Sequence, residues 1–456
     1  MLKSVRAIFL VLAAVLLLTY SSVTCANRNA ANKPAVVSEV TEPDLAIKEG
    51  YVSQKAETVS VLRNGRVVAK VTLGAPVMVA QADKEERWGF FQFPGIYRAD
   101  DGTLIVCWQM SPDSHKYYGK GNSGRMMSRD EGKTWEPLDR DYYKQPSRTL
   151  QLRNGDVLHI STPTSKDINT YPAFPKPVCY DTPNKMSFYL EKDLPADLRG
   201  TYLGLRNEQT KQRSSIHGEL DDPGLMRYAI NNLMPLMWWG EMKELADGSI
   251  LGGIYRCYYE SAEKDAPKSA ITFYRSTDEG NHWKAIGRIP YQIQEMRNDS
   301  RKYDNTRGFS EASFAILRDS SLFCVMRSGY NTPLYRAYSY DGGQQWTEPE
   351  AFTPNGVKPM LMQLDNGVMV LASGRPGVQL RFCLDGDGKV WTKPIEMLPF
   401  IDGKGEYDMW KVSCGYPKLL QVDGNTFYMV YSDFQTRNSL WQKRKAIYFR
   451  KVSITR

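Results

Sequence analysis

Pairs of short apolar runs, each pair separated by a tight turn, recur along the chain. Six such segments occupy residues 97–108, 150–160, 243–255, 315–326, 362–372 and 419–431. Five of the turns are Asp-Gly or Asn-Gly, and the fourth in the series is Asp319-Ser320. Asp-Gly and Asn-Gly accept the positive φ angles that two-residue hairpin turns require. The pattern therefore predicts six β-hairpins.

The spacing of these hairpins predicts the fold. They recur at intervals of roughly 45 to 95 residues, and no long helix-period segment separates most of them. A four-stranded propeller blade takes roughly 40 to 50 residues, so an all-β, six-bladed β-propeller accounts for residues 51–456. A further hairpin at 62–71 is expected to supply a strand that closes the ring against residues 446–454.

The longest gap between hairpins, residues 161–240, contains clusters of Pro, Asn and Asp. It is too long for an ordinary connection between blades, so we expect an insertion at one rim of the propeller. Asp222 and Pro223 are expected to start a short helix within it. Long rim loops are common positions for functional sites.

The N-terminus has the pattern of a secretory signal peptide. Basic residues at positions 3 and 6 precede an apolar run over residues 8–18, and small and polar residues follow. We therefore expect cleavage of residues 1–26, a flexible segment over residues 27–50, and a secreted, periplasmic or cell-surface protein. A lipid anchor at Cys25 is the alternative. The apolar run is too short to cross a bilayer and no other stretch reaches that length, so no membrane span is expected.

Composition narrows the class of ligand. The 456 residues include 27 Tyr, 10 Trp and 16 Phe, which is typical of a folded all-β or carbohydrate-binding protein rather than a disordered one. The net charge of +8 is compatible with an acidic ligand, but Lys and Arg are scattered and form no stripe for nucleic acid. With only four His and no Cys-x-x-Cys pair, neither a metal nor a cofactor is expected.

The six cysteines that follow Cys25 are far apart in sequence. Five of them lie in or beside apolar runs, such as LIVCW at residues 104–108. This placement favours buried small apolar side chains over a disulfide framework.

An eight-residue string, Ser-x-Asp-x-Gly-x-x-Trp, occurs three times, at residues 128–135, 276–283 and 339–346. A looser copy at residues 383–391 has one extra residue before its Trp. The string suits a self-contained turn, in which the Asp carboxylate accepts backbone N–H groups, the Gly takes a left-handed step and the Trp packs beneath. We expect these turns to be structural.

The strings resemble the Asp-boxes, or bacterial neuraminidase repeats, of the sialidase superfamily, whose members are six-bladed propellers. The resemblance covers residues 90–456. It implies a fold and does not fix an activity, because Asp-boxes also occur in proteins that hydrolyse nothing.

Similarity to an exo-sialidase implies three arginines that hold the substrate carboxylate, a Tyr nucleophile activated by a Glu, and an Asp acid/base. The chemistry accounts for this set. A carboxylate on the anomeric carbon would repel an anionic nucleophile, whereas a neutral phenol that shares its proton with a Glu is not repelled. Guanidinium groups bind a carboxylate in a bidentate and permanently charged manner.

The stretch before the third string matches this pattern. Glu311 stands before a strand pair and Arg327 after it, which implies that Glu311 partners the nucleophile and Arg327 binds the carboxylate. The alternative for both is a solvated charge at a strand end.

Two more residues match near the C-terminus. Arg375 precedes the looser string much as the last arginine of the family does. Tyr416, just before a strand, resembles the nucleophile, although Pro417 replaces the Ser of the family segment. A packing role is the alternative for Tyr416.

The first blade departs from the family pattern. Members begin with Phe-Arg-Ile-Pro, whereas this chain reads Phe-Gln-Phe-Pro at residues 91–94, with Gln92 in place of the first arginine. Arg98 either reaches the site from a shifted position or flanks the first hairpin turn. Asp113, between this strand and the first string, is the candidate acid/base. Loss of one bidentate contact to a carboxylate typically costs about 1.5 to 3 kcal/mol of binding free energy.

Two residues outside these strings are further candidates for substrate binding. Trp239 either stacks on a sugar face or packs in the core, and Glu241 would be a second carboxylate in the site.

These observations indicate a secreted exo-glycosidase that cleaves a terminal acidic sugar from a glycan with retention of configuration. Two alternatives remain open. Gln92 and Pro417 favour a noncatalytic glycan-binding propeller, and the same central pocket would also suit a lyase or a glycosidase of different sugar specificity.

Overall fold

The computed structural model of the protein describes residues 35–40, 51–52, 55–138, 149–260, 266–291, 307–329, 332–375, 377–398 and 411–456. Within these ranges the chain forms β-strands and four short 3-10 helices, at His115–Tyr117, Ile168–Thr170, Glu191–Asp193 and Ala196–Leu198. The prediction of an all-β fold is confirmed. The predicted signal peptide, Cys25 and most of the segment 27–50 lie outside the described residues.

All six predicted hairpins are antiparallel strand pairs. They are β6 (Phe90–Arg98) with β7 (Leu104–Met110), β10 (Thr149–Gln151) with β11 (Val157–Ile160), β19 (Gly240–Glu244) with β20 (Ile250–Cys257), β23 (Ser310–Ile316) with β24 (Leu322–Arg327), β27 (Val357–Gln363) with β28 (Met369–Gly374), and β32 (Lys418–Gln421) with β33 (Thr426–Arg437). Glycines of the turns take left-handed angles, for example φ +87° at Gly102 and +85° at Gly248. The turn dipeptides therefore form hairpins for the expected reason.

Further strands extend the hairpins into sheets. Two sheets run in chain order, β6-β7-β8-β9 and β23-β24-β25-β26, with β8 (Ser123–Ser128), β9 (Glu136–Pro137), β25 (Leu334–Ser339) and β26 (Glu350–Thr353). A third has the order β2-β31-β29-β28-β27, with β2 (Tyr51–Val52), β29 (Val378–Cys383) and β31 (Ile395–Leu398).

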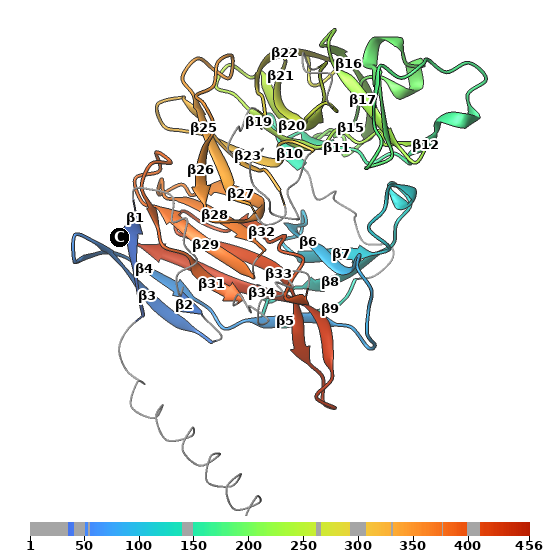
Figure 1. Cartoon of the computed structure of the whole chain (residues 1–456). Coiled ribbons are helices and arrows are strands. Elements are labelled where there is room, and N and C mark those ends of the chain that lie inside the picture. Colours follow the sequence, from blue (N-terminus) through green and yellow to red (C-terminus); the bar gives the residue numbers. More distant parts are fainter. Residues whose placement is uncertain are drawn as a thin grey trace, which may run out of the picture.

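An eight-stranded sheet combines two hairpins. Its order is β10-β11-β15-β16-β22-β21-β20-β19, with β15 (Thr201–Arg206), β16 (Arg213–Asp221), β21 (Ala270–Ser276) and β22 (His282–Ile289). The two halves meet where β16 and β22 pair in parallel. Figure 1 shows the sheets following one another round the molecule, so their arrangement is propeller-like.

The two ends of the described chain meet in one sheet. The last strand, β34 (Lys443–Thr455), pairs with β33 and also with β4 (Arg66–Leu73) and β5 (Val77–Gln81). β3 (Glu57–Arg63), β1 (Ala35–Val40) and β30 (Trp391–Thr392) continue the sheet beyond β4. Val452 lies opposite Leu73, which confirms that the hairpin at 62–71 closes the ring against the C-terminal strand.

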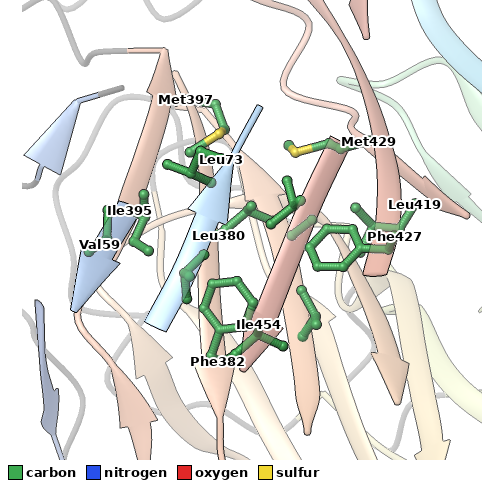
Figure 2. Packing of buried hydrophobic residues seen from close by; sticks show 14 of the residues in the cluster. Val59, Leu73, Leu380, Phe382, Ile395, Met397, Leu419, Phe427, Met429 and Ile454 are labelled. Atoms are coloured by element: carbon green, nitrogen blue, oxygen red, sulfur yellow. The ribbon is translucent and has the colours of Figure 1, made fainter. Parts of the chain in front are cut away.

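Neighbouring sheets pack through fully buried apolar side chains. Figure 2 shows such a cluster, in which Leu380 and Phe382 of β29 meet Phe427 and Met429 of β33 and Ile454 of β34. Burial of an apolar side chain of this size stabilises the fold by roughly 1.5–3 kcal/mol. The cluster therefore fixes the C-terminal sheet against its neighbour.

The predicted insertion at 161–240 is only partly separate. A five-stranded sheet, β12-β18-β17-β14-β13, stands apart from the sheets above and is formed by β12 (Lys166–Asp167), β13 (Cys179–Asp181), β14 (Met186–Leu190), β17 (Met226–Ile230) and β18 (Leu233–Met234). β15 and β16, also inside the predicted range, belong to the sheet of β10 and β11 instead. The prediction of one continuous insertion was therefore wrong over Thr201–Asp221.

The predicted short helix at Asp222 and Pro223 was also wrong, because the segment forms a turn. The Asp222 carboxylate is buried and accepts hydrogen bonds from the hydroxyls of Tyr259 and Tyr274, at 2.6 and 2.8 Å. These long-range bonds leave the Asp side chain unavailable as a helix cap.

The Ser-x-Asp-x-Gly-x-x-Trp turns have a common hydrogen-bond pattern. In the third, Ser339 Oγ donates to Asp341 at 2.9 Å, and the Gly343 N–H donates to Ser339 Oγ at 2.9 Å. The Asp341 carboxylate also accepts the N–H of Gln345 at 2.9 Å, and Trp346 Nε1 donates to the Gly343 carbonyl at 3.1 Å. The first two turns share the Ser–Asp and Gly–Ser bonds, and the second also has the bond from its Trp, in accordance with the predicted structural role.

Six cysteines are described and all are free thiols, four of them buried: Cys257, Cys324, Cys383 and Cys414. The prediction that these cysteines form no disulfide framework is confirmed. No helix within the described ranges has the length and hydropathy needed to cross a membrane.

Candidate active site

A cavity of about 1010 Å³ opens among the sheets and receives residues from β6, β7, β20, β24, β27 and the segment before β32. Seven basic side chains line it: Arg125, Lys243, Arg256, Arg307, Arg327, Lys358 and Lys418. Three acidic residues line it as well: Asp113, Glu241 and Glu311. The excess of positive charge suits an anionic ligand.

Tyr416 and Glu311 form the centre of the site. The Tyr416 hydroxyl donates a hydrogen bond to Glu311 Oε1. Arg327 Nη1 contacts the same carboxylate oxygen at 2.8 Å and the phenol oxygen at 3.3 Å. The backbone N–H of Lys358 donates to the other carboxylate oxygen at 2.9 Å. The phenol, the carboxylate and the guanidinium are thus a single bonded group.

Three residues at the centre of the site have positive backbone φ angles. Glu311, Lys358 and Arg375 have φ of +50°, +45° and +47°. Register shifts interrupt the pairing of β23 with β24 between Ser310 and Ser313, beside Glu311. Positive φ costs a non-glycine residue free energy, and such strain is concentrated at functional sites.

Burial and neighbouring charges shift the pKa values of Glu311 and Tyr416 in opposite directions. Burial would raise the pKa of Glu311, but the charges of Arg327 and Lys358 and the hydrogen bond from Tyr416 outweigh it and lower the pKa to about 2. Burial and the Glu311 charge raise the pKa of Tyr416 well above its ordinary value, against the opposing charges of Arg327 and Arg375. At neutral pH the pair is therefore a neutral phenol bonded to a carboxylate.

Arg375 lies beside the nucleophile candidate. Its guanidinium carbon is 5.5 Å from the ring centroid of Tyr416 and 5.3 Å from that of Trp88, and its Nε donates to the Cys414 carbonyl at 3.0 Å. Only 3% of Arg375 is exposed, and burial lowers its pKa. Arg375 thus contacts the Tyr416 ring from within the protein rather than from the cavity lining.

Trp88 links Arg375 to the acid/base candidate. Trp88 Nε1 donates a hydrogen bond to Asp113 Oδ2 at 3.1 Å. Asp113 is exposed and lines the cavity, as Glu311 and Tyr416 do. The structure therefore brings together Tyr416, Glu311, Arg327, Arg375 and Asp113.

Gln92 and Arg98 are not brought to the cavity. Gln92 is fully buried in β6, where neither atom of its amide has a hydrogen-bond partner among the described residues. Arg98 forms a two-point ion pair with Glu131, with both N···O distances 2.8 Å, and also donates to the Gly102 carbonyl. Arg98 therefore flanks the first hairpin turn, and its assignment to substrate binding is corrected.

Trp239 and Glu241 both line the cavity. Trp239 packs edge-on against Tyr118, with a centroid distance of 5.3 Å. Glu241 accepts hydrogen bonds from Ser313 Oγ at 3.1 Å and from the Phe314 N–H at 2.5 Å. Glu241 thus ties two strands together at the cavity edge.

Several cavity residues were missed by sequence reasoning. Lys358, near the start of β27, and Arg256, near the end of β20, line the cavity and have positive φ, and Trp88, which precedes β6, donates a hydrogen bond to the lining residue Asp113. Only their position relative to a hairpin distinguishes them in the sequence. Within the described chain no three His, Cys, Asp or Glu residues are grouped as metal ligands.

The fold is similar to that of solved structures of low sequence identity. A protein of unknown function from Dyadobacter fermentans superposes with a TM-score of 0.54 at 20% identity, covering 83% of this chain and 99% of that chain. A Hadza microbial sialidase gives a TM-score of 0.45 at 16% identity, covering 85% and 70%. An α-L-arabinanase of Penicillium chrysogenum, complexed with arabinobiose, gives 0.43 at 15% identity, covering 83% and 98%.

No curated protein matches the chain. Residues 236–429 match the model of the BNR repeat-like domain family. This segment carries two of the three Ser-x-Asp-x-Gly-x-x-Trp turns together with Glu311, Arg327 and Tyr416. Residues 236–429 thus carry a BNR repeat-like domain, in agreement with the repeated turns.

Proposed function

We propose that the protein is an exo-glycosidase that hydrolyses the bond to a terminal acidic sugar, sialic acid or a related one, with retention of configuration. The observation that carries the proposal is the bonded group of Tyr416, Glu311 and Arg327 at a cavity rich in basic side chains. A neutral phenol paired with a carboxylate is the nucleophile suited to an anionic substrate.

In the first step the Tyr416 oxygen attacks the anomeric carbon and its proton passes to Glu311. The low pKa of Glu311 keeps the carboxylate free to accept this proton, and transfer becomes favourable as the new C–O bond reduces the basicity of the phenol oxygen. Asp113 protonates the departing glycosidic oxygen. The terminal sugar is then bound covalently to Tyr416.

In the second step Asp113 removes a proton from water, which attacks the anomeric carbon. The bond to Tyr416 breaks and its oxygen regains the proton held by Glu311. Two inversions at one carbon give overall retention. Arg327 holds the substrate carboxylate, and Arg375 stabilises negative charge on the phenol during both steps.

The test is a trapped intermediate. A 2-fluoro or 2,3-difluoro derivative of an acidic sugar slows the second step, so intact-protein mass spectrometry should find one added sugar mass, located on Tyr416 by peptide mapping. Aryl sialosides and related ulosonic-acid and uronic-acid glycosides identify the sugar. Binding of these glycosides without turnover or adduct would instead indicate a noncatalytic glycan-binding protein.

We also propose that the propeller has six blades. The hairpins of β6, β10, β19, β23, β27 and β32 each start a unit of about four strands, including the joined pair of units in the eight-stranded sheet. The signal-peptide pattern of residues 1–26 supports export as a further proposal, which N-terminal sequencing of the secreted protein would test.

A further inference from the structure

Arg256 is a half-buried guanidinium in a part of the cavity that the proposed mechanism does not use. It lies near the end of β20, at φ +63°, beside a register shift between Ile254 and Cys257. Its backbone N–H donates to Ser269 Oγ at 2.9 Å. The bulge turns the side chain out of the strand pattern and onto the cavity lining.

Aromatic rings surround the Arg256 guanidinium. Nη1 donates to the Tyr228 hydroxyl at 2.8 Å, and the guanidinium carbon lies 5.4 Å from the ring centroid of Trp239. The guanidinium carbon is also 5.5 Å from the ring centroid of Tyr228, and Tyr118, Tyr255 and Tyr258 lie within electrostatic range of the charge. Such contacts orient the planar group but do not neutralise it.

No acidic side chain of the described residues forms an ion pair with Arg256. Three other enclosed arginines have such partners: Arg327 pairs with Glu311 at 2.8 Å, Arg227 with Glu191 at 2.6 Å and Arg336 with Glu350 at 2.7 Å. A charge removed from water without a counter-charge is costly, so an enclosed lone cation at a cavity indicates a place for an external anion.

A second arginine shares this wall. Arg307 lines the cavity, and its Nη2 donates to Asn184 Oδ1 at 2.7 Å. Burial and the charges of Arg256 and Arg307 lower the pKa of His115 to about 3, so His115 is neutral at physiological pH and adds no charge of its own. His115 Nε2 is 3.2 Å from the Tyr228 hydroxyl, which fixes the phenol that holds Arg256.

The separate five-stranded sheet supports the two arginines of this wall. Tyr228 belongs to β17, and Asn184 lies in the turn between β13 and β14. Both residues contact an arginine that lines the cavity. The additional sheet therefore helps to hold Arg256 and Arg307 in place.

We propose that Arg256, supported by Tyr228 and Arg307, binds a second anionic group of the glycan, a carboxylate or a sulfate, at a subsite separate from the Tyr416 centre. The inference rests on the proposed function in taking the glycan as substrate. The cavity volume of about 1010 Å³ lies at the upper end of the range of roughly 300–1,000 Å³ for ligand pockets, which leaves room for more than one sugar. The preferred substrate is thus a glycan with two acidic groups.

The first experiment compares kcat/KM for an aryl glycoside of one acidic sugar with that for a disaccharide of two acidic sugars and for a sulfated glycoside. Wild type should prefer the doubly anionic substrates, and Arg256→Met should reduce that preference by about 10- to 100-fold. Arg256→Lys should restore part of it. The control is Arg288→Met, whose guanidinium lies over the Tyr259 ring away from the cavity lining and should leave the preference unchanged.

An unchanged preference in a folded Arg256→Met protein would overturn the proposal. Comparison of the disaccharide of two acidic sugars with the sulfated glycoside shows whether the subsite prefers a carboxylate or a sulfate. Near-UV circular dichroism establishes that each variant is folded, and Arg256→Gln replaces Arg256→Met if the latter is not.

A second experiment separates this inference from the proposed function. If no acidic glycoside is turned over, isothermal titration with inorganic sulfate at low ionic strength still examines the subsite. Wild type should bind one more sulfate than Arg256→Met, whereas Arg288→Met should match wild type. Equal stoichiometry in wild type and Arg256→Met would overturn the subsite, whatever the outcome for glycosidase activity.

Discussion

The phenol of Tyr416 donates a hydrogen bond to the carboxylate of Glu311, although the two residues are 105 positions apart in the sequence. The same kind of group occurs a second time in the molecule. Tyr428 donates to Glu131, and Arg98 is ion-paired with that carboxylate at 2.8 Å. The second group does not line the cavity, and the Glu131 side chain is 54% exposed. It is therefore a natural control for the first.

Tyr416→Phe is expected to lower kcat by at least about 10³-fold, because it removes the attacking oxygen. Tyr428→Phe removes an equivalent hydroxyl outside the cavity and should change kcat less than about twofold. Steady-state rates on the best acidic aryl glycoside check both values. Equal activity of the two variants would exclude Tyr416 as the nucleophile.

The pH dependence of the free energy of unfolding should reveal whether the Glu311 carboxylate is ionised in the folded protein. Its pKa is about 2 in the folded protein against 4.5 ordinarily, so the unfolded chain binds the proton first on acidification. The stabilisation is complete above about pH 4.5 and is lost as pH falls through about 2.

The measurement is the free energy of unfolding in urea, for wild type and for Glu311→Gln, between pH 7 and pH 3. The difference should be constant near neutrality and shrink below about pH 4.5, by an amount on the order of 3 kcal/mol if followed to full protonation. A difference that grows on acidification would contradict the assigned charge state.

Substitutions of Gln92 test whether this position, where the family has its first arginine, can reach the site. Its amide is buried without a hydrogen-bond partner among the described residues, so Gln92→Leu should leave stability unchanged or raise it by about 1–3 kcal/mol. Gln92→Arg would bury an unpaired charge and should destabilise the fold by several kcal/mol. Denaturant unfolding measures both effects. Restoration of tighter substrate binding by Gln92→Arg, without loss of stability, would show that the position does reach the site.

Trp283 tests the structural role of the repeated turns. It is 1% exposed, packs against Trp238 at a centroid distance of 4.7 Å and donates to the Gly280 carbonyl at 2.9 Å. Trp283→Ala should reduce the free energy of unfolding by about 3–5 kcal/mol. At a temperature where the variant is folded, kcat/KM should stay within a few-fold of wild type. A selective loss of activity with little loss of stability would assign these turns a part in the site.

The hairpins were predictable because each depends on a local signal, a turn dipeptide between apolar runs. Glu311, Arg327, Arg375 and Tyr416 were nominated by their resemblance to the sialidase pattern, and the structure brings these four side chains together. Arg98 shows where such reasoning fails, because its partner Glu131 lies in another turn and the ion pair depends on tertiary contact. The prediction of one continuous insertion over residues 161–240 failed for a similar reason.

β15 and β16 have no Asp-Gly or Asn-Gly turn between them, so their membership of a propeller-like sheet leaves no local mark. Arg256 is another example. Its surroundings combine a strand bulge with Tyr228 from a different sheet, and neither is evident from neighbouring residues in the sequence.

The closure of the ring by β34 has a consequence for biosynthesis. β4 and β5 emerge from the ribosome early, whereas β34, which pairs with both, follows the other strands described above. Until β34 has been made, these early strands therefore lack their partner, and the closing contact joins residues far apart in the sequence, such as Leu73 and Val452. Contacts of such high order form slowly, so closure of the ring is expected to come late in folding, and deletion of β34 to be far more harmful than its length suggests.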